Sequence, residues 1–177
     1  MSSTVVHRAP VFQVISDEVI EPSGARVRRD IIRHPGSVVI LALDEHKKEP
    51  SVLLIRQYRH AAGKLMLELP AGRLEAGETT IAGGKRELIE ETGYRAKKWS
   101  KLVSYYASPG FLTETMSILL AEDLTLGESH PEADEKIELH MTPLSEVLRL
   151  IHAGKVEDGK TLIGVLLLAD RRRAAGL

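Results

Sequence analysis

The stretch that decides how this chain is interpreted is GRLEAGETTIAGGKRELIEETGY, at residues 72–94. Its second half has helical spacing and ends at Gly93, a residue suited to closing a helix. Within this predicted helix, Glu87, Glu90 and Glu91 stand at positions i, i+3 and i+4. Residues with that spacing lie on one helix face, so we expect the three carboxylates to stand side by side.

Three neighbouring carboxylates favour a partner of opposite charge. Like charges at this spacing destabilise an isolated helix by about 0.2–0.5 kcal/mol per pair, and a bound cation removes that repulsion. Carboxylate oxygens suit hard ions such as Mg²⁺ or Mn²⁺, which keep several waters and share the phosphates of a substrate. Three glutamates by themselves are more often a solvated helix face, so the metal interpretation depends on the residues around them.

The surrounding residues form a longer pattern: glycine, five residues, glutamate, seven residues, and then Arg-Glu-apolar-x-Glu-Glu-x-Gly-apolar. The positions that satisfy it are Gly72, Glu78, Arg86, Glu87, Leu88, Glu90, Glu91, Gly93 and Tyr94. This pattern is the Nudix box, and its many spaced positions make a chance match very improbable. The chain therefore resembles the Nudix hydrolase family, in which a loop–helix–loop holds metal ions against a pyrophosphate.

The resemblance implies roles for the acidic residues of the box. Glu87 and Glu91 are expected to be the main metal ligands, with Glu90 assisting. The backbone carbonyl of Ala71 is expected to be a further ligand. Glu90 and Glu91 are also expected to take part in catalysis.

Other box residues are expected to have structural roles. By the resemblance these are Gly72, Glu78, Arg86 and Gly93, with Arg86 and Glu78 paired so that they brace the loop against the helix. Gly83 and Gly84 are less usual there, because a glycine inside a helix costs up to about 1 kcal/mol relative to alanine. Close packing of the helix on a sheet would explain both glycines.

Residues outside the box indicate a substrate class. Pro109 lies sixteen residues beyond Gly93, a distance that resembles the ADP-ribose pyrophosphatase subgroup. Glu114, five residues later, matches the position at which that subgroup carries a catalytic base. A glutamate on a loop can deprotonate an attacking water. The alternative for Glu114 is a solvated loop residue.

Three arginines are expected to bind substrate. The segments RQYR at 56–59 and ELPAG at 68–72 resemble the subgroup's approach to the box, so Arg56 and Arg59 are expected to bind substrate, with Arg59 on a phosphate. Arg29 matches a subgroup position that reaches the ligand from the N-terminal region, although it also fits a charge on an edge strand.

These features predict a Mg²⁺-dependent hydrolase, with Mn²⁺ as a substitute, that cleaves ADP-ribose to AMP and ribose 5-phosphate. One alternative is another substrate, such as GDP-mannose or a different nucleotide sugar. A second alternative, of another class, is a non-catalytic module that senses ADP-ribose. By resemblance the protein is expected to be a homodimer, with its N-terminal strands at the interface.

A competing motif occurs near the C-terminus. Residues 154–161, GKVEDGKT, formally satisfy the phosphate-binding pattern G-x4-G-K-T. That pattern requires a strand before the loop, whereas the preceding residues 144–153 have helical spacing. We therefore interpret Gly154 as the end of one helix and Asp158 as a cap for the next.

Composition restricts the remaining classes. The 177 residues carry a formal net charge of -1, which argues against bulk electrostatic binding of nucleic acid, and the absence of cysteine excludes disulfides and thiolate metal sites. No apolar run approaches the roughly 18 residues of a membrane helix. We expect a cytoplasmic protein without membrane association. The acidic residues Glu132, Asp134 and Glu135 are interpreted as a solvated loop.

Hydrophobic periodicity predicts an α/β (α+β) fold with a small N-terminal β region. The resemblance to the Nudix family implies that the main domain is an α/β/α sandwich with a mixed sheet. The predicted strands are 11–20, 26–33, 38–43, 52–55, 102–106, 116–121 and 136–141, and the predicted helices are 78–92, 143–153 and 160–173, with Thr142 as the cap of the second. We place the boundary at 34–36, so that 1–36 form N-terminal strands for dimerisation and 37–177 form the hydrolase domain.

Overall fold

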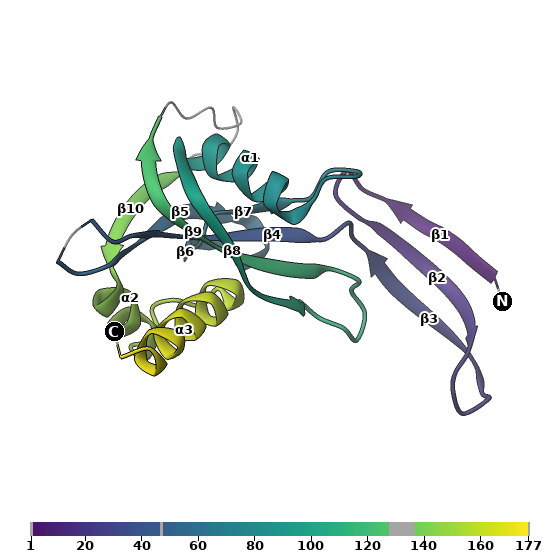
Figure 1. Cartoon of the computed structure of the whole chain (residues 1–177). Helices are drawn as coiled ribbons and strands as arrows, with labels where there is room; N and C mark the ends of the chain where they lie inside the picture. The colour runs from purple at the N-terminus through teal and green to yellow at the C-terminus, as the bar shows by residue number, and fades with distance from the viewer. Residues whose placement is uncertain (1, 47, 128–136, 177) are drawn as a thin grey trace.

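The computed structural model describes residues 2–46, 48–127 and 137–176 (Figure 1). An antiparallel three-stranded sheet, with order β1-β2-β3, projects from the main body of the molecule. Its strands are β1 (Ser2–Arg8), β2 (Gln13–Ile20) and β3 (Arg26–Arg33). The predicted hairpin is confirmed, whereas β1 was not predicted. Every residue of β1 is exposed, so it lacks the alternation of apolar and polar residues that identifies a half-buried strand.

The main body is built on a seven-stranded mixed sheet. Its strand order is β10-β5-β4-β9-β8, with β6 paired to β5 and β7 paired to β4. Strands β4 and β9 run parallel, and the other pairs are antiparallel. The strands are β4 (Ser37–Asp44), β5 (Ser51–Arg59), β6 (Lys64–Glu68), β7 (Ala71–Arg73), β8 (Tyr94–Tyr106), β9 (Thr115–Leu126) and β10 (Glu138–Pro143).

Helices cover both faces of this sheet. Helix α1 (Thr80–Thr92) lies on one face, and α2 (Leu144–His152) and α3 (Gly159–Ala174) lie on the other (Figure 1). A short 3-10 helix, η1 (His60–Ala62), follows β5. The predicted α/β/α sandwich with a mixed sheet is therefore confirmed. None of the helices within the described ranges is long and apolar enough to cross a membrane.

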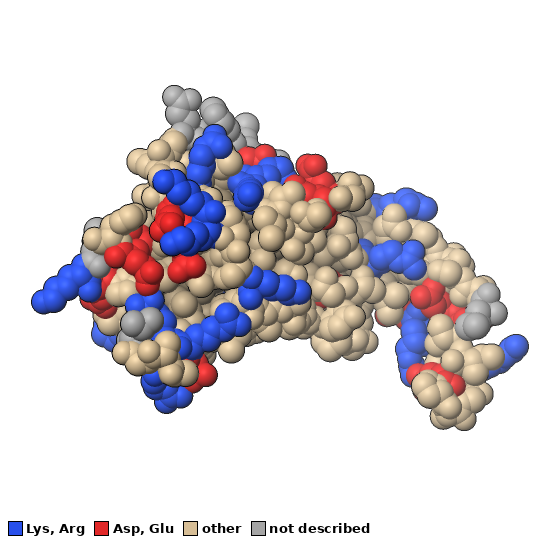
Figure 2. Space-filling model, in the orientation of Figure 1, with Lys and Arg blue, Asp and Glu red and all other residues tan. Residues whose placement is uncertain are grey.

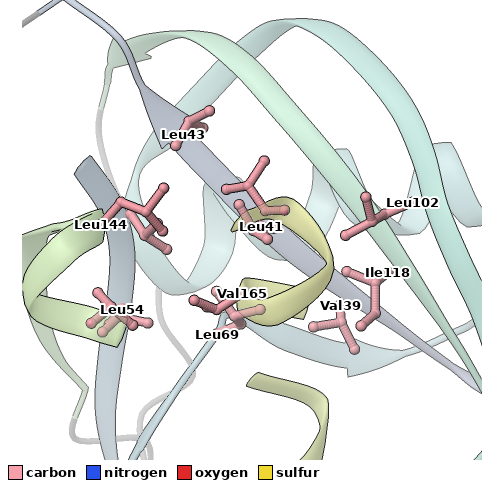
Figure 3. Packing of buried hydrophobic residues seen from close by; sticks show 12 residues of the cluster. Val39, Leu41, Leu43, Leu54, Leu69, Leu102, Ile118, Leu144 and Val165 are labelled. Carbon is pink, nitrogen blue, oxygen red and sulfur yellow. The ribbon is translucent and has the colours of Figure 1, made fainter. Parts of the chain in front are cut away.

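Strand β4 explains why both faces need a cover. Its residues Val39, Leu41 and Leu43 belong to the apolar cluster under α2 and α3, which Figure 3 shows. Its residues Ile40 and Ala42 belong to a second cluster on the opposite face, where α1 lies. Successive side chains of a strand point to opposite faces, so a continuous apolar run fits a strand buried on both sides.

Two helix starts differ from the predictions. Helix α1 begins at Thr80 and not at Glu78, because the Thr79 side chain caps it by accepting a hydrogen bond from the Ala82 amide. The prediction that Thr142 caps α2 was wrong. Pro143 occupies the cap position without a side-chain bond, and the Thr142 hydroxyl donates instead to a backbone carbonyl of its own strand.

The projecting sheet is tied to the body at one loop. The Ile32 amide donates to the Phe111 carbonyl at 2.7 Å, and the Thr113 amide donates to the Ile32 carbonyl at 2.9 Å. The His34 amide donates to the Thr113 hydroxyl at 2.9 Å. The loop that precedes Glu114 is therefore held by the end of β3.

Candidate active site

Gly72 and Glu87 form the closest contact in the box. Gly72 lies on β7, and Glu87 reaches it from α1 across the intervening loop. A Cβ atom built on Gly72 would lie 1.9 Å from both Cδ and Oε1 of Glu87. Only glycine leaves room for this carboxylate, so the first box residue fixes where the Glu87 oxygens lie.

Arg86 connects the box loop to the helix, as predicted. Its Nε and Nη2 donate to the two carboxylate oxygens of Glu78, at 3.1 and 3.0 Å, and Nη2 also donates to the Arg73 carbonyl. Its Nη1 donates to Glu87 at 2.7 Å and to Glu90 at 2.9 Å. The bond to Glu78 is the main reason that the pKa of Arg86 is raised, and the same bond lowers the pKa of Glu78.

Glu91 lies deeper than the other two helix glutamates. It is almost completely buried, and its Oε2 accepts a hydrogen bond from the Ala71 amide at 3.1 Å. Because Ala71 pairs with Val39 in the central sheet, this contact fixes α1 against the sheet at the start of the box. The two predicted ligands Ala71 and Glu91 are therefore adjacent.

The donor chemistry of these residues fits a hard divalent cation. Glu87 and Glu90 already share one positively charged group, Arg86 Nη1, so their oxygens can approach a common cation. Glu91 turns instead towards Ala71. Within the described ranges no three acidic or histidine side chains converge as a ready metal site. A cation would therefore draw these carboxylates together, and Mg²⁺ or Mn²⁺ is the type of ion that carboxylate and carbonyl oxygens bind.

Glu114 lies beside β4, the strand that pairs with the box strand β7. Its carboxylate accepts a hydrogen bond from the Ser37 hydroxyl at 2.6 Å, and His34 Nδ1 lies 3.6 Å from the same oxygen. Ser37 is the register partner of Arg73, which follows the box glycine. The Glu114 side chain is mostly buried, so it is not the solvated loop residue that was the alternative interpretation.

A second network holds Arg59. Its guanidinium donates two parallel hydrogen bonds to Glu68, at 2.9 and 2.8 Å, while 39% of its side chain remains exposed. Only 2% of the Glu68 side chain is exposed, and Lys160 also donates to it. Burial opposes ionisation of Glu68, but the Arg59 bond and the Lys160 charge outweigh that effect and lower its pKa. The Glu68 bond raises the pKa of Arg59.

Comparison with known proteins identifies the family. The NUDIX domain family matches residues 33–163, which is more than half of the chain. The chain belongs to the Nudix family. The ADP-ribose pyrophosphatase of Bacillus subtilis (strain 168) is 36% identical over 160 residues, covering 89% of this chain and 85% of that protein.

Another Nudix relative carries a different substrate in its name. The GDP-mannose pyrophosphatase of Cronobacter sakazakii (strain ATCC BAA-894) is 33% identical over 164 residues, covering 86% of this chain and 84% of that protein. A solved structure described as an ADP compounds hydrolase matches with a TM-score of 0.84, over 99% of this chain and 94% of that one. Its sequence identity is 20%, so this likeness shows the fold alone.

The other two predicted arginines pair with carboxylates outside the Nudix box. Arg56 is half exposed on β5, where its Nη1 lies 3.9 Å from Glu138. Arg29 lies in the projecting sheet and pairs with Glu21 of the same hairpin. In Figure 1 the middle of β3 stands away from α1, so one chain does not bring Arg29 to the box. Their roles in substrate binding stay predictions.

Close packing accounts for the two unusual glycines of the Nudix helix. A Cβ on Gly84 would lie 2.9 Å from Leu119 and 3.1 Å from Trp99, both on the sheet. A Cβ on Gly83 would lie 2.8 Å from Leu74 in the box loop. The expected packing on the sheet is confirmed for Gly84, whereas Gly83 makes room for the loop.

The competing phosphate-binding motif is excluded by the structure. Helix α2, and not a strand, precedes residues 154–161, and Asp158 caps α3 as predicted. The Thr161 hydroxyl accepts a hydrogen bond from the Leu69 amide at 2.7 Å. Lys160 and Thr161 therefore hold the segment before the box. This role was not predicted from the sequence, because the contacts join residues 92 positions apart.

Charged side chains of both signs are mixed on the surface. Figure 2 shows basic and acidic side chains interspersed on the visible face, without one large basic area. The predicted acidic loop residues Glu132, Asp134 and Glu135 lie outside the described residues.

Proposed function

We propose that this Nudix protein hydrolyses the pyrophosphate bond of a nucleoside diphosphate sugar, and that ADP-ribose is its preferred substrate. Water attacks one phosphorus, the bond from that phosphorus to the bridging oxygen breaks, and the products are AMP and ribose 5-phosphate. The observation that carries the proposal is the Gly72–Glu87 contact, which holds a carboxylate of α1 against the box strand. The names of the similar proteins support the substrate class.

A divalent cation is part of this proposal. Glu87, Glu90, Glu91 and the Ala71 carbonyl would hold it. Three carboxylates and a diphosphate would otherwise repel each other, and a bound Mg²⁺ would supply charge neutralisation and a more acidic water. Arg86 keeps Glu87 and Glu90 in place through its shared Nη1.

Glu114 is our candidate for the base that takes the proton of the attacking water. Its position beside Ser37, next to the box strand, supports this assignment. Replacing Glu114 by glutamine keeps the size and one acceptor but removes the base. We expect kcat to fall by about 10²–10⁴-fold, the usual contribution of a general base.

The Glu114→Gln measurement is a steady-state assay of ADP-ribose hydrolysis across pH, with calorimetric Mg²⁺ binding as the control. Unchanged Mg²⁺ affinity with a low kcat is the expected result. A kcat within about threefold of the wild type would assign the base elsewhere.

Arginines are proposed to bind the diphosphate. Arg59 presents a planar group suited to paired phosphate oxygens and retains exposed surface beside the box. Arg56 is proposed to assist from the same strand. Arg29 is proposed to reach the site of a partner chain in a homodimer, because its own chain places it away from the box. We also propose a cytoplasmic location.

The first experiment is phosphate release from a panel of nucleoside diphosphate sugars in the presence of Mg²⁺, using phosphatase coupling. A strong preference for ADP-ribose, lost in Glu91→Gln, supports the proposal. That variant keeps an acceptor for the Ala71 amide, so folding should be preserved. A preference for GDP-mannose, the substrate in the name of the second relative, would be consistent with the same active site but would overturn ADP-ribose as the preferred substrate. Tight binding of ADP-ribose without turnover under Mg²⁺ or Mn²⁺ would indicate a sensor.

A further inference from the structure

The rejected motif at residues 154–161 leaves a buried charge that the proposed chemistry does not use. Lys160 is the second residue of α3, and only 8% of its side chain is exposed. Lysine is almost never buried to this extent unless it is paired. Its Nζ donates to Glu68 and lies 3.0 Å from Asp158, so it stands between two carboxylates.

Glu68 lies between Lys160 and Arg59. Both carboxylate oxygens bond the Arg59 guanidinium, and Oε2 also accepts from Lys160. Four charged groups therefore form one compact cluster of Arg59, Glu68, Asp158 and Lys160, which we name the Arg59 cluster. At neutral pH two members are cationic and two are anionic, so the net charge of the cluster is zero.

Only one end of this cluster is exposed. Arg59 has 39% of its side chain exposed, whereas Glu68 and Lys160 are buried. If Arg59 were the sole counter-ion of the buried Glu68, the Glu68 carboxylate would neutralise the positive charge of the arginine. The attraction of Arg59 for a phosphate therefore depends on the charges behind it. The Glu68 bond is the main reason that the pKa of Arg59 is raised, and the charges of Glu91 and Asp158 act in the same direction.

We propose that Lys160 is a positioning residue that supplies Glu68 with a second counter-charge and thereby keeps Arg59 available to a substrate phosphate. This inference rests on the proposed function, because it assigns the ligand of Arg59 as the diphosphate of the substrate. Substrate affinity should then follow the net charge of the Arg59 cluster.

Three variants test the dependence on charge. Lys160→Met makes the cluster net negative, and we expect KM to rise by about tenfold with kcat changed by less than about threefold. The double variant Glu68→Gln with Lys160→Met restores zero net charge, so its KM should return towards the wild type. Asp158→Asn makes the cluster net positive and keeps a good helix cap, so its KM should fall by about threefold.

The readouts separate this role from a purely structural one. If Lys160 has only a structural role, Lys160→Met lowers the melting temperature but leaves the KM of the folded enzyme unchanged. That result would overturn the proposal. An unaltered or raised KM in Asp158→Asn would also overturn it, and this variant should fold even if Lys160→Met does not. The KM differences should shrink as salt is added, because salt screens the exposed end of the cluster.

The proposed function is tested separately. Calorimetric titration with ADP-ribose in the absence of added metal gives a Kd for each variant without requiring turnover. If the wild type does not hydrolyse ADP-ribose but the Kd values follow the predicted order, the proposed enzymatic function is rejected and the role of Lys160 is retained. If ADP-ribose is hydrolysed but all variants have identical Kd and KM values, the role of Lys160 is rejected and the proposed enzymatic function is retained.

Discussion

Two arginine–carboxylate networks flank the proposed site, and they are built in different ways. Arg86 bonds Glu78, Glu87 and Glu90, all within one segment of the chain. Arg59 bonds Glu68, which is held in turn by Lys160 from a helix 92 positions away. The first network is a local brace, and the second is assembled by the fold.

The difference in burial indicates a difference in purpose. Two of the acidic partners of Arg86, Glu87 and Glu90, are proposed metal ligands, so this network would shape the metal site. The Glu68 side chain is buried and Arg59 is partly exposed, so the second network is proposed to present a cation to substrate. Under the proposed function, the same pairing of arginine with carboxylate would serve metal binding in one place and phosphate binding in the other.

Among the variants that compare the two networks, the largest effect is expected at Gly72, the glycine under the local network. In Gly72→Ala the new Cβ would overlap the Glu87 carboxylate, and that flexible side chain must move. A displacement of about 1 Å in a catalytic group reduces rates by roughly 10²-fold, so we expect kcat to fall by that amount. Steady-state hydrolysis and thermal melting measure the change. A normal kcat would show that the position of Glu87 does not matter.

The same substitution in the two networks should produce different defects. Arg86→Lys loses the paired bonds to Glu78 and should lower the free energy of unfolding by about 1–3 kcal/mol. Arg59→Lys should instead raise KM by about tenfold, because a lysine cannot present paired donors to phosphate. Denaturant unfolding and steady-state kinetics measure the two effects. Equal kinetic defects in both variants would abolish the distinction between the networks.

Acid should weaken the buried network. The pKa of Glu68 is lowered in the folded state, so its contribution to stability is present above its ordinary pKa of 4.5 and is lost as pH falls through the folded pKa. Below about pH 4.5 we expect the melting temperature to decrease as the pH falls, and to decrease less steeply in Glu68→Gln. Glu78→Gln should change this slope less, since Glu78 is more exposed. Parallel melting curves for wild type and Glu68→Gln would contradict the expectation.

The smallest effect on activity is expected at Gly84, a matched control for Gly72. Its new Cβ would press on Leu119 and Trp99, away from the carboxylates. Overpacking costs about 1–3 kcal/mol, and the gain in helix propensity offsets up to about 1 kcal/mol. We therefore expect Gly84→Ala to lower the free energy of unfolding by about 1 kcal/mol without changing kcat. A large loss of kcat would show that the helix position is coupled to catalysis.

Most of the sheet and all three α-helices were predictable because their signals are local. The apolar run of β4 and the spacing of α1 can be read from neighbouring residues. Strands β1, β6 and β7 were missed, since β1 is fully exposed and β7 has three residues. Strand β8 begins at Tyr94, earlier than predicted, because its first half alternates mainly between charged and partly buried residues.

The amino-acid pattern alone predicted the Nudix box, its helix and the face that carries the three glutamates, because the helix period fixes which side chains share a face. The resemblance to the family implied the pairing of Arg86 with Glu78, which lies before the helix begins. Tertiary structure alone decided that Glu87 lies over Gly72, that Ser37 holds Glu114, and that Lys160 stands behind Arg59. Such contacts join distant segments, and the packing of α1 and α3 on opposite faces of one sheet brings those segments together.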